Sequence, residues 1–409
     1  MIQNDAVILG LLAATLGVVF WTLRSAHPFW QRFYKYVPAL VLCYFLPALF
    51  NTFGLIDGEQ SKLYFVASRY LLPATLVLLT LSIDLPATLR LGPKALVMFF
   101  VGTVTVVLGG PIALLIWQNL APEAVDPELW RGLTAVAGSW IGGSANQAAM
   151  KEVFEIEANV FGAMVAVDVL FANLWMAVLL WMAAKHERLD RGLKADTSAI
   201  AALGQKMDRL RLENERIPEL PDLMIMLGLA FGATGLSHAL AIPVAAAFAG
   251  MEWAERLSLA SEFFWIVVLA TTFGLLLSFT RARKLEGAGA SRVGSAMLYV
   301  LIATVGMQMN IGAVFSSAVL FGIGFTWMAF HAVVMLVVAR MIKAPTFFLA
   351  VGSQANIGGA ASAPVVAAAF HPSLAPVGVL LAVLGYALGT YGGWICGQLM
   401  RLVSGGAAP

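Results

Sequence analysis

The sequence predicts an all-α, polytopic membrane protein built from two inverted structural repeats, and three observations support this fold class. Of the 409 residues, 60% are hydrophobic and 12% are charged, about half the charged fraction of a typical soluble protein. The apolar residues are gathered in long runs, and two of these runs carry a similar motif of glycine, serine and amide residues. Because so little polar surface is available to enclose so much apolar chain, the expected solvent is lipid.

The chain contains twelve apolar runs of about 17 to 29 residues, each long enough to cross a hydrocarbon core of about 30 Å as a helix. Strand-type alternation is absent from the sequence, which excludes an outer-membrane barrel. The residues before the first run include an acid and no Lys or Arg, so we expect this run to stay as a membrane helix. The runs cover residues 6–23, 36–53, 64–83, 95–117, 131–150, 158–184, 222–248, 260–280, 294–312, 318–340, 346–370 and 374–400.

One long polar stretch, from Lys185 to Pro221, separates the sixth run from the seventh. It divides the chain into a first membrane repeat, residues 1–184, and a second, residues 222–409, with residues 185–221 as a cytoplasmic linker. Two interpretations of the linker stay open: a solvated tether, or a tether that holds a short amphipathic helix around residues 200–212.

Basic residues in short loops tend to stay in the cytoplasm, so their placement predicts topology. Twelve simple crossings would put the basic loops of one half outside. The conflict disappears if the fifth run enters and leaves the membrane on one side, because the two halves are then inverted. The loop after the fourth run is acidic. Basic residues follow the first run (Arg24, Arg32, Lys35), the third (Arg90, Lys94), the eighth (Arg281, Arg283, Lys284, Arg292) and the tenth (Arg340, Lys343), and the central linker follows the sixth.

The fifth and eleventh runs contain the residues least suited to lipid. Residues 138–147 read GSWIGGSANQ and residues 352–362 read GSQANIGGAAS. Each glycine lowers helix stability by about 1 kcal/mol relative to alanine, and buried amides need partners. We therefore predict a break in each run, covered by protein or reached by water, where freed backbone groups bind ligands. The alternative is that the small residues only allow close helix packing.

We expect the polar residues of both breaks to meet in one substrate site at mid-membrane. The predicted substrate-binding residues are Ser139, Gly142, Gly143, Ser144, Asn146, Gln147, Gln354, Asn356, Gly358, Gly359 and Ser362.

Asp168 lies in the middle of the sixth run, where a carboxylate is costly unless it is paired, neutralised or exposed to a water-filled cavity. We expect it to carry the coupling ion, as a proton carrier or as a sodium ligand, and a structural, protonated Asp is the alternative. Asn173 follows in the same run, and Asn310 is matched with Asp84 as a further ion-coupling candidate, with ordinary helix termination as the simpler interpretation of that pair. His331, in the tenth run, is either a proton relay or a satisfied buried histidine.

Several function classes lose support. The net charge of +2 indicates no nucleic-acid surface. Cys43 and Cys396 lie in apolar runs, which argues against disulfides, zinc clusters and iron–sulfur sites. Motifs of zinc proteases, ATP-driven pumps and hydrolases are absent, so we expect no enzyme activity and no cofactor other than a coupling ion.

The chain resembles the membrane-protein family known as domain of unknown function 819, over nearly its whole length. The resemblance is carried by GSWIGGSANQ, by GSQANIGG, by the Asp168 segment that ends in Asn173-Leu174-Trp175-Met176, and by residues 384–391, LGYALGTY. That family is grouped with the superfamily of cation:proton antiporters and anion transporters. The resemblance implies inverted repeats, a core domain with two crossing broken segments, and elevator-type movement against a scaffold domain. The superfamily commonly makes the broken segments full crossings, whereas the charge argument favours re-entrant ones.

The expected function is secondary active transport in the cytoplasmic (inner) membrane. The solute is small and organic, with anions as one class, and sodium or protons drive its symport. A cation:proton antiporter is the first alternative, and a channel or receptor without coupled transport is the second. The expected partners are membrane lipid and the solute, no nucleic acid is expected, and a homodimer stays an open option.

Overall fold

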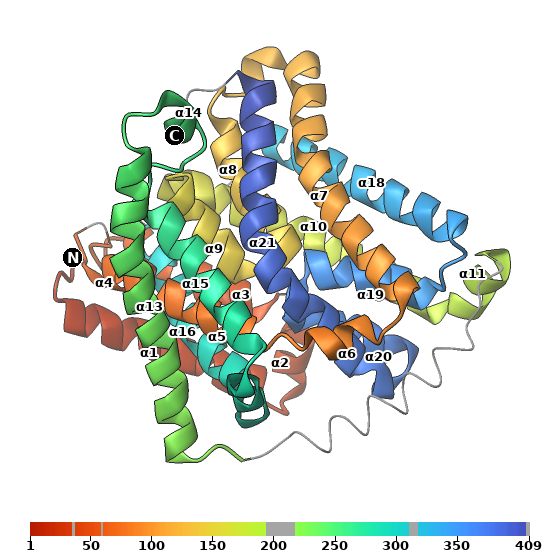
Figure 1. The fold of residues 1–409 in the computed structure, drawn as a ribbon, viewed down its shortest axis with the longest axis horizontal. Helices are drawn as coiled ribbons and strands as arrows, with labels where there is room; N and C mark the ends of the chain where they lie inside the picture. Colours follow the sequence, from red (N-terminus) through yellow and green to blue (C-terminus); the bar gives the residue numbers. More distant parts are fainter. Residues whose placement is uncertain (35–36, 59, 194–216, 311–317, 406–409) are drawn as a thin grey trace.

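The computed structural model describes residues 1–34, 37–58, 60–193, 217–310 and 318–405. Apart from one isolated β-bridge between Ile2 and Ile56, every regular element in these residues is a helix (Figure 1). Seven helical stretches are long and apolar enough to cross a membrane, and an eighth is reached if Glu262–Ser278 and Arg281–Ala288, bent by 94°, form one span. The protein is therefore a multi-pass membrane protein. Two predicted segments lie outside the described residues: the amphipathic helix at 200–212 and the end of the ninth run, residues 311–312.

The apolar runs become helices of two kinds. Runs one, three, four, six, seven, ten and twelve become the seven long stretches, whereas the second and ninth become shorter helices of 14 and 17 residues. The elements of the first half are α1 (Asp5–Leu23), α2 (Pro28–Phe33), α3 (Ala39–Thr52), α4 (Leu63–Val66), the π-helix η1 (Ala67–Leu71), α5 (Leu72–Leu81), α6 (Leu85–Leu89), α7 (Pro93–Leu120), η2 (Pro122–Ala124), α8 (Leu129–Gly142), α9 (Ser144–Val153) and α10 (Ala158–Ala184). Those that follow are α11 (His186–Leu193), α13 (Leu220–Phe248), α14 (Glu252–Arg256), α15 (Glu262–Ser278), η3 (Arg281–Ala288), α16 (Ala290–Gly306), α18 (Ala318–Met341), α19 (Thr346–Ile357), α20 (Gly359–Phe370), η4 (Pro372–Leu374) and α21 (Ala375–Ser404).

The fifth run folds back on itself as a helical hairpin, α8 followed by α9, here named hairpin 1. The Trp130 ring at its start lies 5.7 Å from the Phe154 ring just after its end. Near the tip the two arms are so close that a Cβ on Gly138 would lie 2.7 Å from the Asn146 carbonyl oxygen. Gly143 makes the turn with φ +78°, a conformation that glycine adopts without the steric cost of a side chain.

The eleventh run forms a second hairpin, α19 followed by α20, here named hairpin 2. Its base is also closed by aromatic rings, those of Phe347 and Phe370, 5.3 Å apart. Gly359 provides the positive φ, +57°, at its tip. A Cβ on Gly359 would lie 3.8 Å from Gly143 Cα, so the tips of the two hairpins meet.

Contacts between loops define two ends of the molecule. At the end that we name the basic end, Arg283 Nη1 contacts Asp84 Oδ1 at 3.1 Å and Lys94 Nζ donates to the Lys343 carbonyl at 3.1 Å. The base of hairpin 2 lies at this end, where the backbone N–H of Thr346 donates to Asp190. The basic loops after the third, eighth and tenth runs, which the sequence predicts to share one side, therefore lie together.

Hairpin 1 enters from the other end of the molecule. Its base is followed directly by Asn159, whose Oδ1 accepts from the Asn310 backbone N–H at 2.9 Å. The Met307 carbonyl in turn lies against Gly58, and the Ile2 N–H donates to the Leu55 carbonyl at 2.8 Å. The two hairpins thus approach from opposite ends, hairpin 1 from the end that lacks the basic loops.

Two helix bundles make up the molecule (Figure 1). The panel bundle consists of α1, α3, α5, α13, α15 and α16, and the hairpin bundle consists of α7 to α10 and α18 to α21. They contact each other mainly where α9 and α21 meet α5 and α15. Each bundle takes helices from both halves of the chain, so the division into residues 1–184 and 222–409 is not a division in space.

Candidate functional site

A cavity of about 890 Å³ lies between the two bundles. The hairpin tips, α10 and α21 form one wall, and α1, α3 and α16 form the other. The cavity extends toward the basic end, since Phe20, Pro38, Ser291 and Arg292 line it beside the basic loops. The predicted site residues that line it are Ser139, Gly143, Ser144, Asp168, Asn173, Gln354, Gly358, Gly359 and Ser362.

Asp168 lies on α10, with 4% of its surface exposed, and binds both arms of hairpin 1. Its Oδ2 accepts from Ser139 Oγ at 2.7 Å and from Gln147 Nε2 at 3.0 Å. Its Oδ1 accepts from Trp140 Nε1 at 2.8 Å. Three donors compensate for the loss of water around the carboxyl group. The sequence does not identify Trp140 as a site residue, although it lies inside the motif. An indole close to a glycine pair is more typical of a side chain that packs between helices.

Two glutamines, one on each hairpin, have a buried side-chain oxygen without a hydrogen-bond partner among the described residues. Gln147 Oε1 is the first, beside Asp168. Gln354 Oε1 is the second, and its Nε2 donates to Ser362 Oγ at 2.7 Å across the tip of hairpin 2. Buried polar atoms are rarely left without partners, so each oxygen is a candidate contact for a bound ion or solute. Of the two side chains, only Gln354 lines the cavity.

Asn146 and Asn356 are fully buried and lie outside the cavity lining. Asn146 Nδ2 donates to the carbonyls of Gly142 and Tyr386, each at 3.0 Å, and its Oδ1 accepts from Thr390 at 2.7 Å. These bonds attach hairpin 1 to α21.

Asn356 has the equivalent set of partners on hairpin 2. Its Nδ2 donates to the Gly352 and Phe99 carbonyls at 3.0 and 2.9 Å, and Thr103 Oγ1 donates to its Oδ1 at 2.8 Å. These bonds attach hairpin 2 to α7. The four amides therefore do not meet in one site, because both asparagines have all their polar atoms bound by neighbouring helices. Gly142 also lies behind the cavity wall, packed against Gly385 and Gly389.

The ion-coupling candidates besides Asp168 are separated by the fold. Asn173 lines the cavity, and its Nδ2 donates to the Val169 carbonyl of its own helix at 2.7 Å. Asn310 is exposed at the end where hairpin 1 enters, away from the cavity. Asp84 accepts from the Ala87 N–H and caps α6 at the basic end, which is the helix-termination role.

His331 is fully buried, and both its ring nitrogens are hydrogen-bonded. Trp175 Nε1 donates to Ser353 Oγ at 2.7 Å, so the Ser353 hydroxyl is free to donate to His331 Nε2, 2.7 Å away. On the other side, Thr105 donates to the Gly102 carbonyl and accepts from His331 Nδ1 at 2.7 Å. This directional chain fits a neutral imidazole with the proton on Nδ1, which supports the structural interpretation.

The cavity also contains residues that the sequence reasoning did not propose as ligands. Arg292 and Tyr299 come from α16, and Tyr386 comes from α21. Among the described residues that line the cavity, Asp168 is the only acid and Arg292 the only base. In the sequence Arg292 is a topology signal only, and no local pattern indicates that α16 faces the hairpin tips. The described residues contain no cluster of three or more His, Cys, Asp or Glu that would hold a transition metal.

The chain is similar to known proteins over most of its length. The family described as protein of unknown function (DUF819) matches residues 10–403. The uncharacterized membrane protein YjcL of Bacillus subtilis (strain 168) is 22% identical over 361 residues, which cover 86% of this chain and 86% of that protein. The family match includes both hairpins and every residue that lines the cavity between the bundles.

Proposed function

The chain belongs to the DUF819 family, and we propose that it is a secondary active transporter of the cytoplasmic membrane that couples movement of a small organic solute to a sodium or proton gradient. One observation carries the proposal. Hairpins 1 and 2 enter from opposite ends of the molecule, and their tips meet at the boundary between the two helix bundles. The tips lie beside a buried carboxylate and a cavity. Helix breaks at membrane depth are tolerated where they line such a cavity, and there they form ligand sites.

The proposed alternating access relies on movement between the two bundles. The cavity extends toward the basic end, whereas at the other end α9 packs against α5 and α15. Movement of the hairpin bundle along the panel bundle would carry the tips, and a solute bound to them, from one end to the other. We propose this elevator-type movement, with the two halves of the chain as inverted repeats and both hairpins as re-entrant segments.

Asp168 is the proposed coupling residue. Its carboxylate and the neighbouring Gln147 Oε1 supply the oxygen atoms that a sodium ion prefers, and the carboxylate alone can carry a proton. Because all three donors to Asp168 come from hairpin 1, binding of an ion there is transmitted directly to the tip.

An anion is the proposed class of solute. The N-termini of α9 and α20 lie at the two hairpin tips. The exposed Arg292 faces the cavity from the panel bundle. Helix N-termini and a guanidinium group both favour negative charge. Gln354, with its one unpartnered amide atom, would bind a neighbouring polar group of the same solute.

A cation:proton antiporter is the second candidate, and the observation in its favour is that Asp168 is the only acid among the described residues that line the cavity. In that mechanism both cations compete for Asp168 and no organic solute is needed. We propose no enzymatic activity, since Ser139 donates to Asp168 and the described lining of the cavity holds no histidine to act as its base.

A binding screen followed by a flux measurement tests the proposal. The unfolding temperature of the purified protein is measured with monocarboxylates and dicarboxylates of two to six carbons, each beside its neutral amide, in sodium and in potassium chloride. The best carboxylate is then followed into proteoliposomes under sodium, proton or no gradient. We expect saturable, gradient-driven uptake with counterflow. Cation exchange without any organic ligand would favour the antiporter, and non-saturable flux would indicate a channel.

A further inference from the structure

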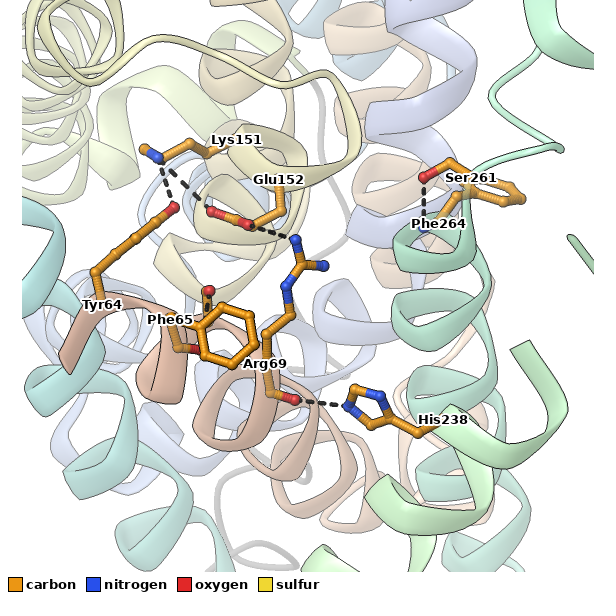
Figure 2. A network of polar contacts seen from close by, with 9 residues as sticks. Tyr64, Phe65, Arg69, Lys151, Glu152, His238, Ser261 and Phe264 are labelled. Carbon is orange, nitrogen blue, oxygen red and sulfur yellow. Dashed lines mark hydrogen bonds and ion pairs between the residues drawn. The ribbon is translucent and has the colours of Figure 1, made fainter. Parts of the chain in front are cut away.

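At the end where hairpin 1 enters, a network of four polar side chains joins the two bundles (Figure 2). Lys151 and Glu152 come from α9 in the hairpin bundle. Tyr64 and Arg69 come from α4 and η1, which lead directly into α5 of the panel bundle. Lys151 Nζ donates to the Tyr64 hydroxyl and lies 3.6 Å from Glu152 Oε1. Glu152 Oε2 lies 4.0 Å from Arg69 Nη2. We name these four residues the gate network.

The two charges from the hairpin bundle are nearly buried in this contact. The side chains of Lys151 and Glu152 are only 8% and 11% exposed. Lysine and glutamate are rarely buried unless they are paired, because the loss of water must be compensated. The contacts of Lys151 with Tyr64 and of Glu152 with Arg69 exist only while the bundles touch here, so the network stabilises only this arrangement.

Arg69 is held firmly by its own bundle. Pro73, four residues later, has no N–H to donate to the Arg69 carbonyl, and the helix widens here into the π-helix η1. His238 Nε2 of α13 contacts that carbonyl at 2.8 Å instead, as Figure 2 shows. The guanidinium group also lies 4.2 Å from the centre of the Phe263 ring. The contact with Glu152 therefore joins α9 to a residue that α13 and α15 of the panel bundle also contact.

The position of the network relative to the cavity gives it a role. Glu152 is nine residues beyond the tip at Gly143, about 13 Å along a helix with a rise of 1.5 Å per residue. The cavity extends from the same tip in the other direction, toward the basic end. The site thus lies between an open mouth and the gate network.

We propose that the gate network is the closed gate of the transport cycle: it holds the two bundles together while the cavity is open at the basic end, and it must separate before the cavity opens at the other end. This role rests on the proposed transporter function. It predicts that weakening the network shifts the equilibrium toward the opposite access state.

The test follows access to a cysteine at the hairpin tip. Ser144→Cys is introduced after Cys43→Ala and Cys396→Ala, and a membrane-impermeant sulfonated maleimide is added to intact cells and, separately, to inside-out vesicles. Glu152→Gln and Arg69→Gln should raise labelling from the side of the gate network, and lower labelling from the basic end, by about two- to fivefold, the population change expected for loss of one partly buried ion pair. Tyr64→Phe removes one hydroxyl and should act in the same direction.

Glu128→Gln is the matched control, because it breaks the Glu128–Arg131 ion pair at the same end but within α8 alone. It should leave both labelling rates unchanged. Unchanged rates in Glu152→Gln and Tyr64→Phe, or faster labelling from both sides, would overturn the gate and make the network a structural contact. If labelling changes as expected while proteoliposomes show no solute or ion flux, the gate stands and the transporter proposal fails.

Discussion

Hairpins 1 and 2 have matching backbones: an aromatic pair closes each base, and a glycine with positive φ turns each tip. Their side chains differ at equivalent motif positions. In hairpin 1 the Gly-Ser serine, Ser139, binds the carboxylate of Asp168, whereas in hairpin 2 Ser353 binds the imidazole of His331. The shared backbone places both tips at the cavity, and the different side chains are the reason why we propose ion binding at hairpin 1 and a solute contact at hairpin 2.

The largest expected difference between the hairpins lies in their titratable partners. Asp168→Asn should abolish the effect of sodium or of pH on the unfolding temperature, with a loss of ion affinity of at least about tenfold, or ~1.4 kcal/mol. His331→Gln should leave this ion response intact, because the imidazole is bound only to Ser353 and Thr105. The ion response is obtained from unfolding temperatures measured in sodium chloride and in potassium chloride between pH 5 and 8. Asp84→Asn, at the cap of α6, is the control, and an ion response that survives Asp168→Asn would assign Asp168 to structure.

The glycines at the tips should separate stability from binding. A Cβ on Gly142 would lie 2.6 Å from the Gly385 carbonyl and 2.8 Å from Gly389 Cα, which are backbone atoms that cannot rotate away. We expect Gly142→Ala to cost about 3 kcal/mol of unfolding free energy. A Cβ on Gly358 meets the side chains of Ser362 and Gln354, which can rotate.

Gly358→Ala should therefore cost less stability but break the Gln354–Ser362 bond and weaken carboxylate binding. Denaturant unfolding and thermal-shift titration of both variants decide this. Equal losses of stability with unchanged binding would show that hairpin 2 has a packing role only.

The two asparagines should behave as equivalent structural anchors. Asn146→Ala and Asn356→Ala each remove three side-chain hydrogen bonds, two of which join a hairpin to a neighbouring helix, at about 2 kcal/mol. Because they bind different helices and share no partner, the double variant should lose the sum within about 0.5 kcal/mol. The unfolding free energies of the three variants test this. A less-than-additive loss of ligand affinity would restore the shared site that the sequence suggests.

The smallest expected effects come from the matched serines. Ser139→Ala and Ser353→Ala should each cost about 1 kcal/mol of stability, the typical value of one hydrogen bond. Only Ser139→Ala should also weaken the ion response, since only this hydroxyl binds Asp168. Parallel ion titrations of the two purified variants compare them, and an equal change in both would contradict the division of roles between the hairpins.

Sequence reasoning located the breaks correctly because a helix break is a local property. Gly143 and Gly359 turn the two tips, and Asp168, an isolated acid in an apolar run, lines the cavity between them. The same reasoning grouped all four amides in one site, since amide composition alone does not tell which way a side chain points. Gln354 faces the cavity, while Asn146 and Asn356 face neighbouring helices.

The sequence by itself therefore determined that this chain is a membrane protein, where its helices break, and which basic loops share one side. Hydropathy, helix propensity and loop charge each act over short stretches of chain. Only the tertiary structure decided that the tips of the two hairpins meet, that Arg292 from α16 faces these tips, and that Lys151 reaches Tyr64 across 87 residues of sequence. Such contacts depend on how distant helices pack, and packing uses side chains whose direction no local pattern fixes.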